Sequence, residues 1–120
     1  MNRAISAFAH GFVFALHGIR YALRTQRNMR VHLLIAAAVV LAGVALALSS
    51  LQWAIIALTM ALVLSLEMIN TVVESVVDLV SPAHHPLAKT AKDVAAGAVL
   101  IAALFAVVIG ALIFGPRVLR

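Results

Sequence analysis

The residues able to do chemistry are concentrated in one part of the chain. All four acidic residues lie in a single stretch: Glu67, Glu74, Asp78 and Asp93. At about 100° per residue in an α-helix, five polar side chains of this stretch share one helix face: Glu67, Asn70, Thr71, Glu74 and Asp78. An apolar run, Ile55 to Leu66, leads directly into this face. Carboxylates near a membrane are costly and point to function, so we expect a polar site here.

The residue types in this stretch suggest acid–base and phosphate chemistry. Glu67, at the end of the apolar run, is placed to act as a general base. Glu74, two turns on, offers the oxygen ligand that a hard divalent cation prefers. Lys92 can hold phosphate oxygens as a point charge. In the alternative reading, Glu74 and Asp78 form a solvated face that pairs with basic side chains, namely Arg27, Arg30 or Lys92.

Composition places the chain in a membrane. Of its 120 residues 65% are hydrophobic, and the mean hydropathy is +1.14, whereas soluble domains are about 45–50% apolar. Without cysteine, the chain can form neither a disulfide nor a thiolate metal site. The net charge of +5 suits anionic lipid headgroups, and we expect no nucleic-acid partner. No glycine-rich nucleotide loop or hydrolase motif occurs.

Residues 2–25 predict an amphipathic helix on the membrane surface. Apolar side chains recur every three or four residues: Phe8, Phe12, Leu16, Ile19 and Leu23. Arginines lie mostly off this stripe, as in helices that lie in the membrane interface. The helix serves either as an anchor alone or also as one wall of a site, in which Gly18 and Arg20 would face a headgroup or phosphate.

Three membrane spans are expected, at about 31–48, 51–70 and 94–114, which makes the chain one all-α domain over residues 1–120. His32, within the first span, is interpreted only as a polar residue near its start. The helix of the second span should continue to about Val80, followed by a polar loop over 81–91, with Pro82 and Pro86 as helix breakers. Gly115-Pro116 should end the third helix.

The distribution of basic residues predicts the orientation. Five arginines follow the start of the chain, and Lys89 and Lys92 lie near the second loop, whereas the C-terminal end has Arg117 and Arg120. The positive-inside rule then places the N-terminus in the cytoplasm and the C-terminus outside. Small residues in the spans allow close helix packing, and three helices alone shield a polar face poorly, so self-association is expected.

Two motifs carry a family resemblance. Glu67-Met68-Ile69-Asn70-Thr71-Val72-Val73-Glu74-Ser75-Val76-Val77-Asp78, followed by Ala91-Lys92-Asp93-Val94-Ala95-Ala96-Gly97-Ala98, closely resembles the prokaryotic diacylglycerol kinase and undecaprenol kinase family. Gly18-Ile19-Arg20 and the segment from Arg27 to His32 are also similar to that family. The resemblance implies a homotrimer in the bacterial inner membrane that transfers the γ-phosphate of ATP, with Mg²⁺, to the hydroxyl of a membrane lipid alcohol.

The resemblance also implies residue roles. Glu67 would be the catalytic base, Asn70 a polar residue of the site, and Glu74 a metal ligand that also contacts nucleotide. Gln26, as well as His85, Lys92 and Asp93, would contact nucleotide. Gln26 stands where members often have a second metal-binding glutamate; its amide oxygen can ligate Mg²⁺ but brings no charge. The loop from Ser81 to Lys89 is more similar to the undecaprenol kinase branch, although the acceptor stays open between undecaprenol and diacylglycerol.

A non-enzymatic alternative is a small membrane scaffold, or an oligomer whose acidic ring conducts cations. The acidic face lies at the cytoplasmic edge, and no polar stripe crosses a span, so this alternative is the less favoured one.

Overall fold

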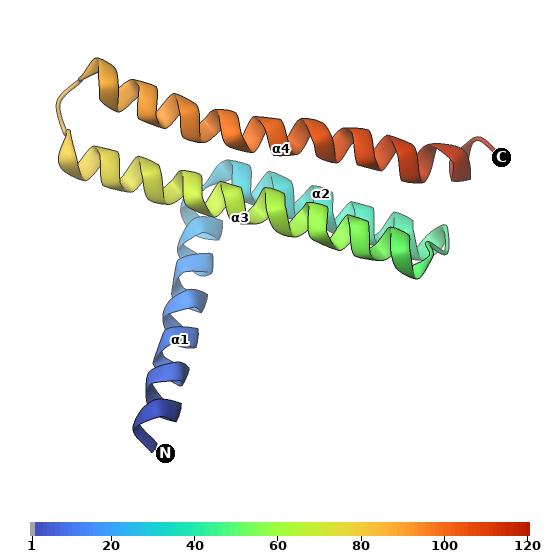
Figure 1. The fold of residues 1–120 in the computed structure, drawn as a ribbon, viewed down its shortest axis with the longest axis horizontal. Coiled ribbons are helices and arrows are strands. Elements are labelled where there is room, and N and C mark those ends of the chain that lie inside the picture. The colour runs from blue at the N-terminus through green and yellow to red at the C-terminus, as the bar shows by residue number, and fades with distance from the viewer. Residues whose placement is uncertain (1) are drawn as a thin grey trace.

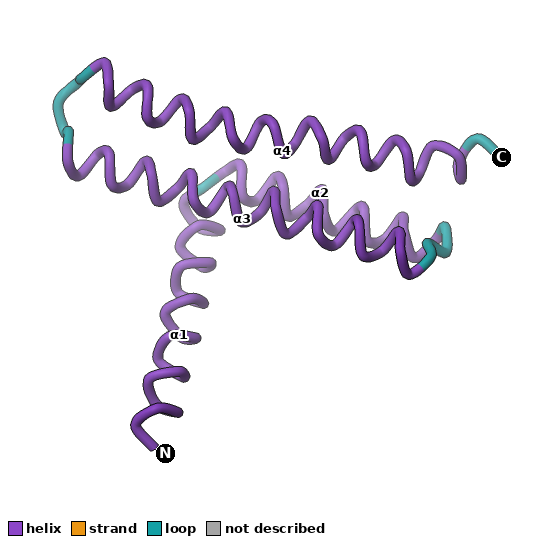
Figure 2. The backbone as a smooth tube through the Cα atoms, viewed as in Figure 1, coloured by secondary structure: helices purple, strands orange, loops and turns teal. Residues whose placement is uncertain are grey.

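The computed structural model describes residues 2–120, which form four helices: α1 (Asn2–Thr25), α2 (Arg27–Ala45), α3 (Ser50–Val80) and α4 (Pro86–Val118). Figure 1 shows α2, α3 and α4 side by side, whereas α1 runs across their long direction. The connections are short, as Figure 2 shows. Helix α3 is central, because it packs against both α2 and α4. The all-helical prediction is confirmed.

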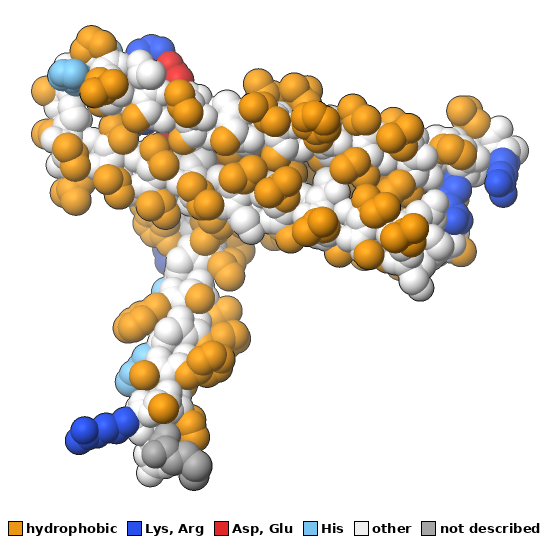
Figure 3. Space-filling model, viewed as in Figure 1, with side chains coloured by type: hydrophobic (Ala, Val, Ile, Leu, Met, Phe, Trp, Pro, Cys, Tyr) orange, Lys and Arg blue, Asp and Glu red, His pale blue; other side chains and the backbone are white. Residues whose placement is uncertain are grey.

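The three bundled helices are each long and apolar enough to cross a membrane. In the single chain most of their large apolar side chains are exposed, and Figure 3 shows them spread along the bundle. A small buried cluster of Leu48, Ile56 and Ile113 lies toward the α2–α3 turn, with Trp53 packed against it. Lipid, or further copies of the chain, must therefore cover most of this surface.

The α2–α3 turn is closed by two local motifs. Leu48 N donates to Gly43 O at 3.1 Å and Ala47 N to Val44 O at 3.2 Å, with Ala47 at φ 52°; this is a Schellman motif. Ser49 then caps α3: its Oγ accepts from Gln52 N at 3.2 Å, while Gln52 Oε1 accepts from Ser49 N at 3.0 Å, which forms a capping box. Helix α2 thus ends at Ala45, three residues before the predicted end of the first membrane span.

Arg117, near the end of α4, ties this turn to the rest of the bundle. Its Nη1 donates to Leu46 O at 2.6 Å and to Ala47 O at 3.0 Å, and its Nη2 donates to Gln52 Oε1 at 2.6 Å. The guanidinium therefore satisfies carbonyls that the end of α2 leaves without helical partners. We call this group of contacts the Arg117 clamp.

The other end of the bundle corrects the predicted loop. Helix α3 does continue to Val80, as predicted. The connection covers only residues 81–85, however, and α4 already begins at Pro86. Proline suits the first helical position, since its fixed φ is helical and its missing N–H needs no partner there. The predicted loop over 81–91 is therefore wrong in its second half.

The end of α4 also differs from the prediction. Pro116 lies inside the helix, which continues to Val118. This proline removes only one backbone donor, and the last turn still closes when Leu119 N donates to Gly115 O at 3.0 Å. A proline in the final turn therefore ends the helix slightly later than its position suggests.

A single extended residue, Gln26, separates α1 from α2. The predicted polar junction from Thr25 to His32 is thus mostly helical. Arg30 Nη1 donates to Leu23 O and Arg24 O, both at 3.0 Å. Ala22 and Met29 are buried at the same corner. The corner between α1 and α2 is therefore held by packing and by hydrogen bonds.

Candidate active site

The most buried large side chain of the described residues is a carboxylate. Glu67 on α3 is 2% exposed, and Asn70 and Thr71, one turn further, are also buried. Thr71 Oγ1 donates to Glu67 O at 3.1 Å, which satisfies its hydroxyl within the helix. Asn70 Nδ2 donates to Glu74 Oε1 at 3.4 Å. The polar face predicted from the sequence is thus turned partly into the bundle and places Glu67, Asn70 and Glu74 together.

His32 of α2 is the side chain that faces Glu67. Its Nε2 lies 3.6 Å from Glu67 Oε2, and its side chain is 20% exposed. Within residues 2–120, Glu67 Oε2 and Asn70 Oδ1 are buried without a hydrogen-bond partner. Buried polar atoms are normally satisfied, so two unpartnered oxygens side by side on α3 indicate a place for a ligand.

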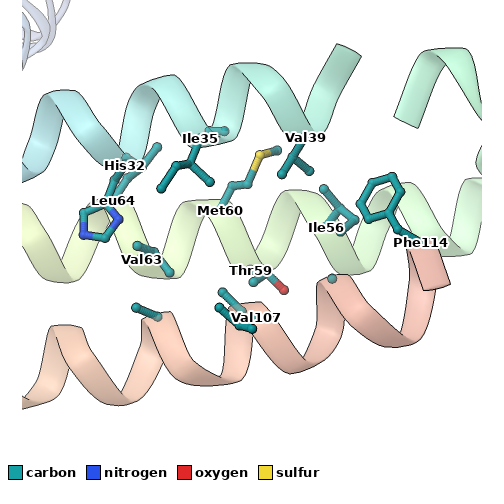
Figure 4. A pocket seen from close by; sticks show the side chains of 14 residues that line it. His32, Ile35, Val39, Ile56, Thr59, Met60, Val63, Leu64, Val107 and Phe114 are labelled. Atoms are coloured by element: carbon teal, nitrogen blue, oxygen red, sulfur yellow. The ribbon is translucent and has the colours of Figure 1, made fainter. Parts of the chain in front are cut away.

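Two cavities meet at His32. One, of about 290 Å³, is lined in part by polar groups and includes Asn28, His32, Glu67 and Asn70. The other, also about 290 Å³, is almost entirely apolar and runs between the three bundled helices from His32 to Phe114. Figure 4 shows its labelled side chains, with His32 at one end and Phe114 at the other. His32 and Ala103 line both cavities, so a polar site opens beside an apolar one.

The remaining charged residues of the predicted site lie further along the bundle. Lys92 of α4 forms an ion pair with Asp78 of α3, which is the pairing that the solvated-face alternative predicted. Asp78 is eleven residues beyond Glu67, or about 17 Å along the helix axis. Asp93 pairs with Lys89 on the surface. Lys92 and Asp93 are thus not brought to Glu67 within one chain.

Within the described residues, four further predicted site residues make no polar contact with Glu67. His85 caps α4, because its Nδ1 accepts from Leu87 N at 3.1 Å. Gln26 Nε2 donates to Thr25 Oγ1 at 3.3 Å. Gly18 and Arg20 are exposed on α1. Among residues 2–120, no hydrogen bond or ion pair joins these four residues to Glu67, Asn70 or Glu74.

The side chains near Glu74 provide some, but not all, of the ligands that a bound metal ion needs. No group of three His, Asp or Glu side chains suited to a metal ion occurs within residues 2–120. Mg²⁺, however, is commonly held by one or two carboxylates together with substrate phosphates and water. The half-buried Glu74 carboxylate, with the unpartnered Asn70 Oδ1 one turn away, fits such a site.

Sequence reasoning missed His32 as a site residue. The signal was present, since His32 is the one ionisable residue between Val31 and Leu48, and an ionisable residue within a membrane span usually has a functional partner. What the sequence did not provide was the register between α2 and α3 that places His32 opposite Glu67.

The fold and site define a small helical membrane protein in which a buried carboxylate lines a polar cavity, next to a histidine that also lines an apolar cavity. The profile of the family described as "Prokaryotic diacylglycerol kinase" matches residues 13–114, and the chain belongs to this family. The predicted resemblance is thereby confirmed, and the chain is a membrane lipid kinase. Family membership decides against the alternative of a non-enzymatic scaffold or cation channel.

Relatives of two activities are similar to the chain. The undecaprenol kinase of Bacillus subtilis (strain 168) is 45% identical over 113 residues, which cover 94% of this chain and 92% of that protein. The diacylglycerol kinase of Synechocystis is 49% identical over 109 residues, or 90% of this chain and 62% of that protein. A diacylglycerol kinase of Helicobacter pylori is 42% identical over 60 residues, about half of each chain.

Proposed function

We propose that this lipid kinase transfers the γ-phosphate of ATP to the hydroxyl of a membrane lipid alcohol, with Glu67 as the general base. The observation that carries the proposal is the buried Glu67 carboxylate, which lines the polar cavity and faces His32, where the polar and apolar cavities meet. A lipid chain in the apolar cavity would end where a carboxylate can accept the proton of its hydroxyl.

The reaction needs positioning more than covalent chemistry. Glu67 takes the proton of the lipid hydroxyl while the lipid oxygen forms a bond to the γ-phosphorus. The bond from that phosphorus to the bridging oxygen breaks, and ADP leaves. The burial of Glu67, which is 2% exposed, would limit the access of water, the competing acceptor, to the phosphate.

We assign the nucleotide and metal to the polar side of Glu67. Glu74, with the oxygens of Asn70 and Gln26, would hold Mg²⁺, which when bound supplies positive charge to the phosphate oxygens. Lys92, Asp93 and His85 would contact the nucleotide from α4 and its cap. Since Lys92 is paired with Asp78, the phosphates would share this ammonium group or take it from Asp78.

Between the two acceptors, the apolar cavity favours undecaprenol. Its lining has two hydrogen-bonding side chains, His32 and Thr59, and the Thr59 hydroxyl already donates to Ile55 O at 2.7 Å. A polyprenol has one polar group, its hydroxyl, whereas diacylglycerol also carries two ester carbonyls that would seek donors near Glu67. The Bacillus subtilis relative, named undecaprenol kinase, supports the same choice.

We place the chain in the membrane with α1 as an amphipathic helix on the cytoplasmic surface. In support, α1 runs across the bundle (Figure 1), and its large apolar side chains are exposed, among them Phe8, Phe12 and Leu16. The N-terminus would then be cytoplasmic and the C-terminus external. A reporter fused after Arg120 that reads as cytoplasmic would refute this orientation.

We further propose that the active protein is a homotrimer with sites shared between subunits. One observation supports it: the bundle exposes most of its large apolar side chains, which neighbouring subunits would cover. Side chains of a neighbouring subunit would then contribute to the site.

The test is the Glu67→Gln variant, assayed with saturating ATP and lipid alcohol in mixed micelles. Gln keeps the shape and the hydrogen bonds but removes the basicity, so kcat should fall about 100-fold or more, while ATP binding changes little. A near-normal kcat in assembled protein would remove Glu67 from the catalytic role. Matched assays with undecaprenol and diacylglycerol decide the acceptor, since kcat/KM should be higher for undecaprenol.

A further inference from the structure

The contact between His32 and Glu67 joins two helices at the centre of the site. The closest approach is 3.6 Å, from His32 Nε2 on α2 to Glu67 Oε2 on α3. In the described part of the chain, no lysine or arginine forms an ion pair with Glu67, and Oε2 is buried without a hydrogen-bond partner. Among the described residues, His32 is thus the one basic side chain within ion-pair distance of Glu67.

His32 also lies where the two cavities meet. It is a lining residue of both the polar and the apolar cavity. Figure 4 shows its ring at one end of the apolar cavity, which Ile35, Val63 and Leu64 also line. A lipid hydroxyl that reaches Glu67 from the apolar side would pass beside this ring. A change of the ring therefore affects the carboxylate and the path to it together.

We propose that His32 is the positioning residue for the catalytic base: its Nε2–H holds Glu67 Oε2 and leaves the other carboxylate oxygen directed at the lipid hydroxyl. This proposal rests on the proposed role of Glu67. A distance of 3.6 Å is slightly longer than a hydrogen bond, and contacts of this kind commonly shorten when a substrate fills the site. A carboxylate held at one oxygen keeps the other in a fixed direction, which is what proton removal requires.

The proposal separates two kinds of substitution. His32→Gln places an amide N–H where Nε2–H stood and should keep kcat within about fivefold of the wild type. His32→Leu and His32→Phe fill the space without a donor and should lower kcat about 10- to 100-fold. The KM for ATP should stay unchanged in all three. His10→Leu, on the exposed surface of α1, is the matched control that keeps normal activity.

The decisive measurement is a double-mutant cycle with Glu67→Gln, with assembly of every variant checked by size-exclusion chromatography. If His32 acts through Glu67, the double variant His32→Leu/Glu67→Gln is no slower than Glu67→Gln alone. Three results would each overturn the proposal. The first is a double variant whose loss in kcat is the product of the losses of the two single variants. The others are a His32→Gln variant with a kcat no higher than that of His32→Leu, and a fully active His32→Leu variant.

If neither His32→Leu nor His32→Phe assembles, the positioning role is also overturned, and the ring has a structural role instead. If Glu67→Gln itself is active, the proposed function fails first, so the two failures are distinguishable.

Discussion

Loss of the Arg117 clamp should destabilise the end of the bundle opposite the charged residues of the site. In Arg117→Met the apolar stem stays, but the three hydrogen bonds to Leu46 O, Ala47 O and Gln52 Oε1 are lost. Hydrogen bonds to a charged group are worth about 1.5–3 kcal/mol each. Water replaces part of this stabilisation in the variant, because two of the contacts are only partly buried and the one to Ala47 O is exposed. We therefore expect a loss of about 2–4 kcal/mol in total.

The assay is thermal unfolding in detergent, followed by circular dichroism and by residual kinase activity. At about 3–5 °C per kcal/mol for a chain of this size, the apparent Tm should fall by about 10 °C. Arg117→Lys keeps the charge but loses the forked geometry of the guanidinium, so its Tm should fall by less than that of Arg117→Met. Arg120→Met removes one arginine from the exposed C-terminus and serves as the control. A Tm for Arg117→Met equal to that of Arg120→Met would refute the reasoning.

Three further predictions concern the metal, the assembly and the packing. Gln26→Glu should retain activity and lower the Mg²⁺ concentration needed for half-maximal rate, while Glu74→Ala should be nearly inactive; a Mg²⁺ titration unchanged by Gln26→Glu would argue against a metal role for position 26. Mixed oligomers of Glu67→Ala and Lys92→Ala chains should recover part of the activity that each variant lacks, whereas no recovery after confirmed mixing would place each site within one subunit. Gly43→Ala should cost about 1 kcal/mol net, since its Cβ would lie 2.6 Å from Trp53 Cη2; Gly11→Ala, whose Cβ meets nothing within 4 Å, should not lower the Tm.

The helix boundaries could be predicted from the sequence where the residues there all favoured the same structure. The run from Leu51 to Val80 carries no proline or glycine, so its continuation as one helix followed from the sequence. Proline was ambiguous, because the same residue is favoured at a helix start and disfavoured within a helix. Pro86 begins α4 and Pro116 lies in its last turn, and only the tertiary structure decided which effect applied.

The site was predictable in composition but not in arrangement. The spacing of Glu67, Asn70 and Glu74 on one helix face requires only the helical period, and the structure brings these three together. The pairing of Glu67 with His32 depends on how α2 and α3 align, and that alignment is set by the length of the turn and by the packing of Trp53 on Gly43. The ion pair of Lys92 with Asp78 likewise depends on the short connection over residues 81–85.

The single-residue corner at Gln26 has a consequence for how the protein meets bilayers of different thickness. With one residue between α1 and α2, and Arg30 bonded back to Leu23 O and Arg24 O, the corner has little slack. With α1 on the membrane surface, as proposed above, a corner fixed in this way would set the depth of His32, five residues into α2. A thicker or thinner bilayer would then be accommodated by tilt of the whole bundle or at the α2–α3 turn, and the level of the site beneath the headgroups would stay constant.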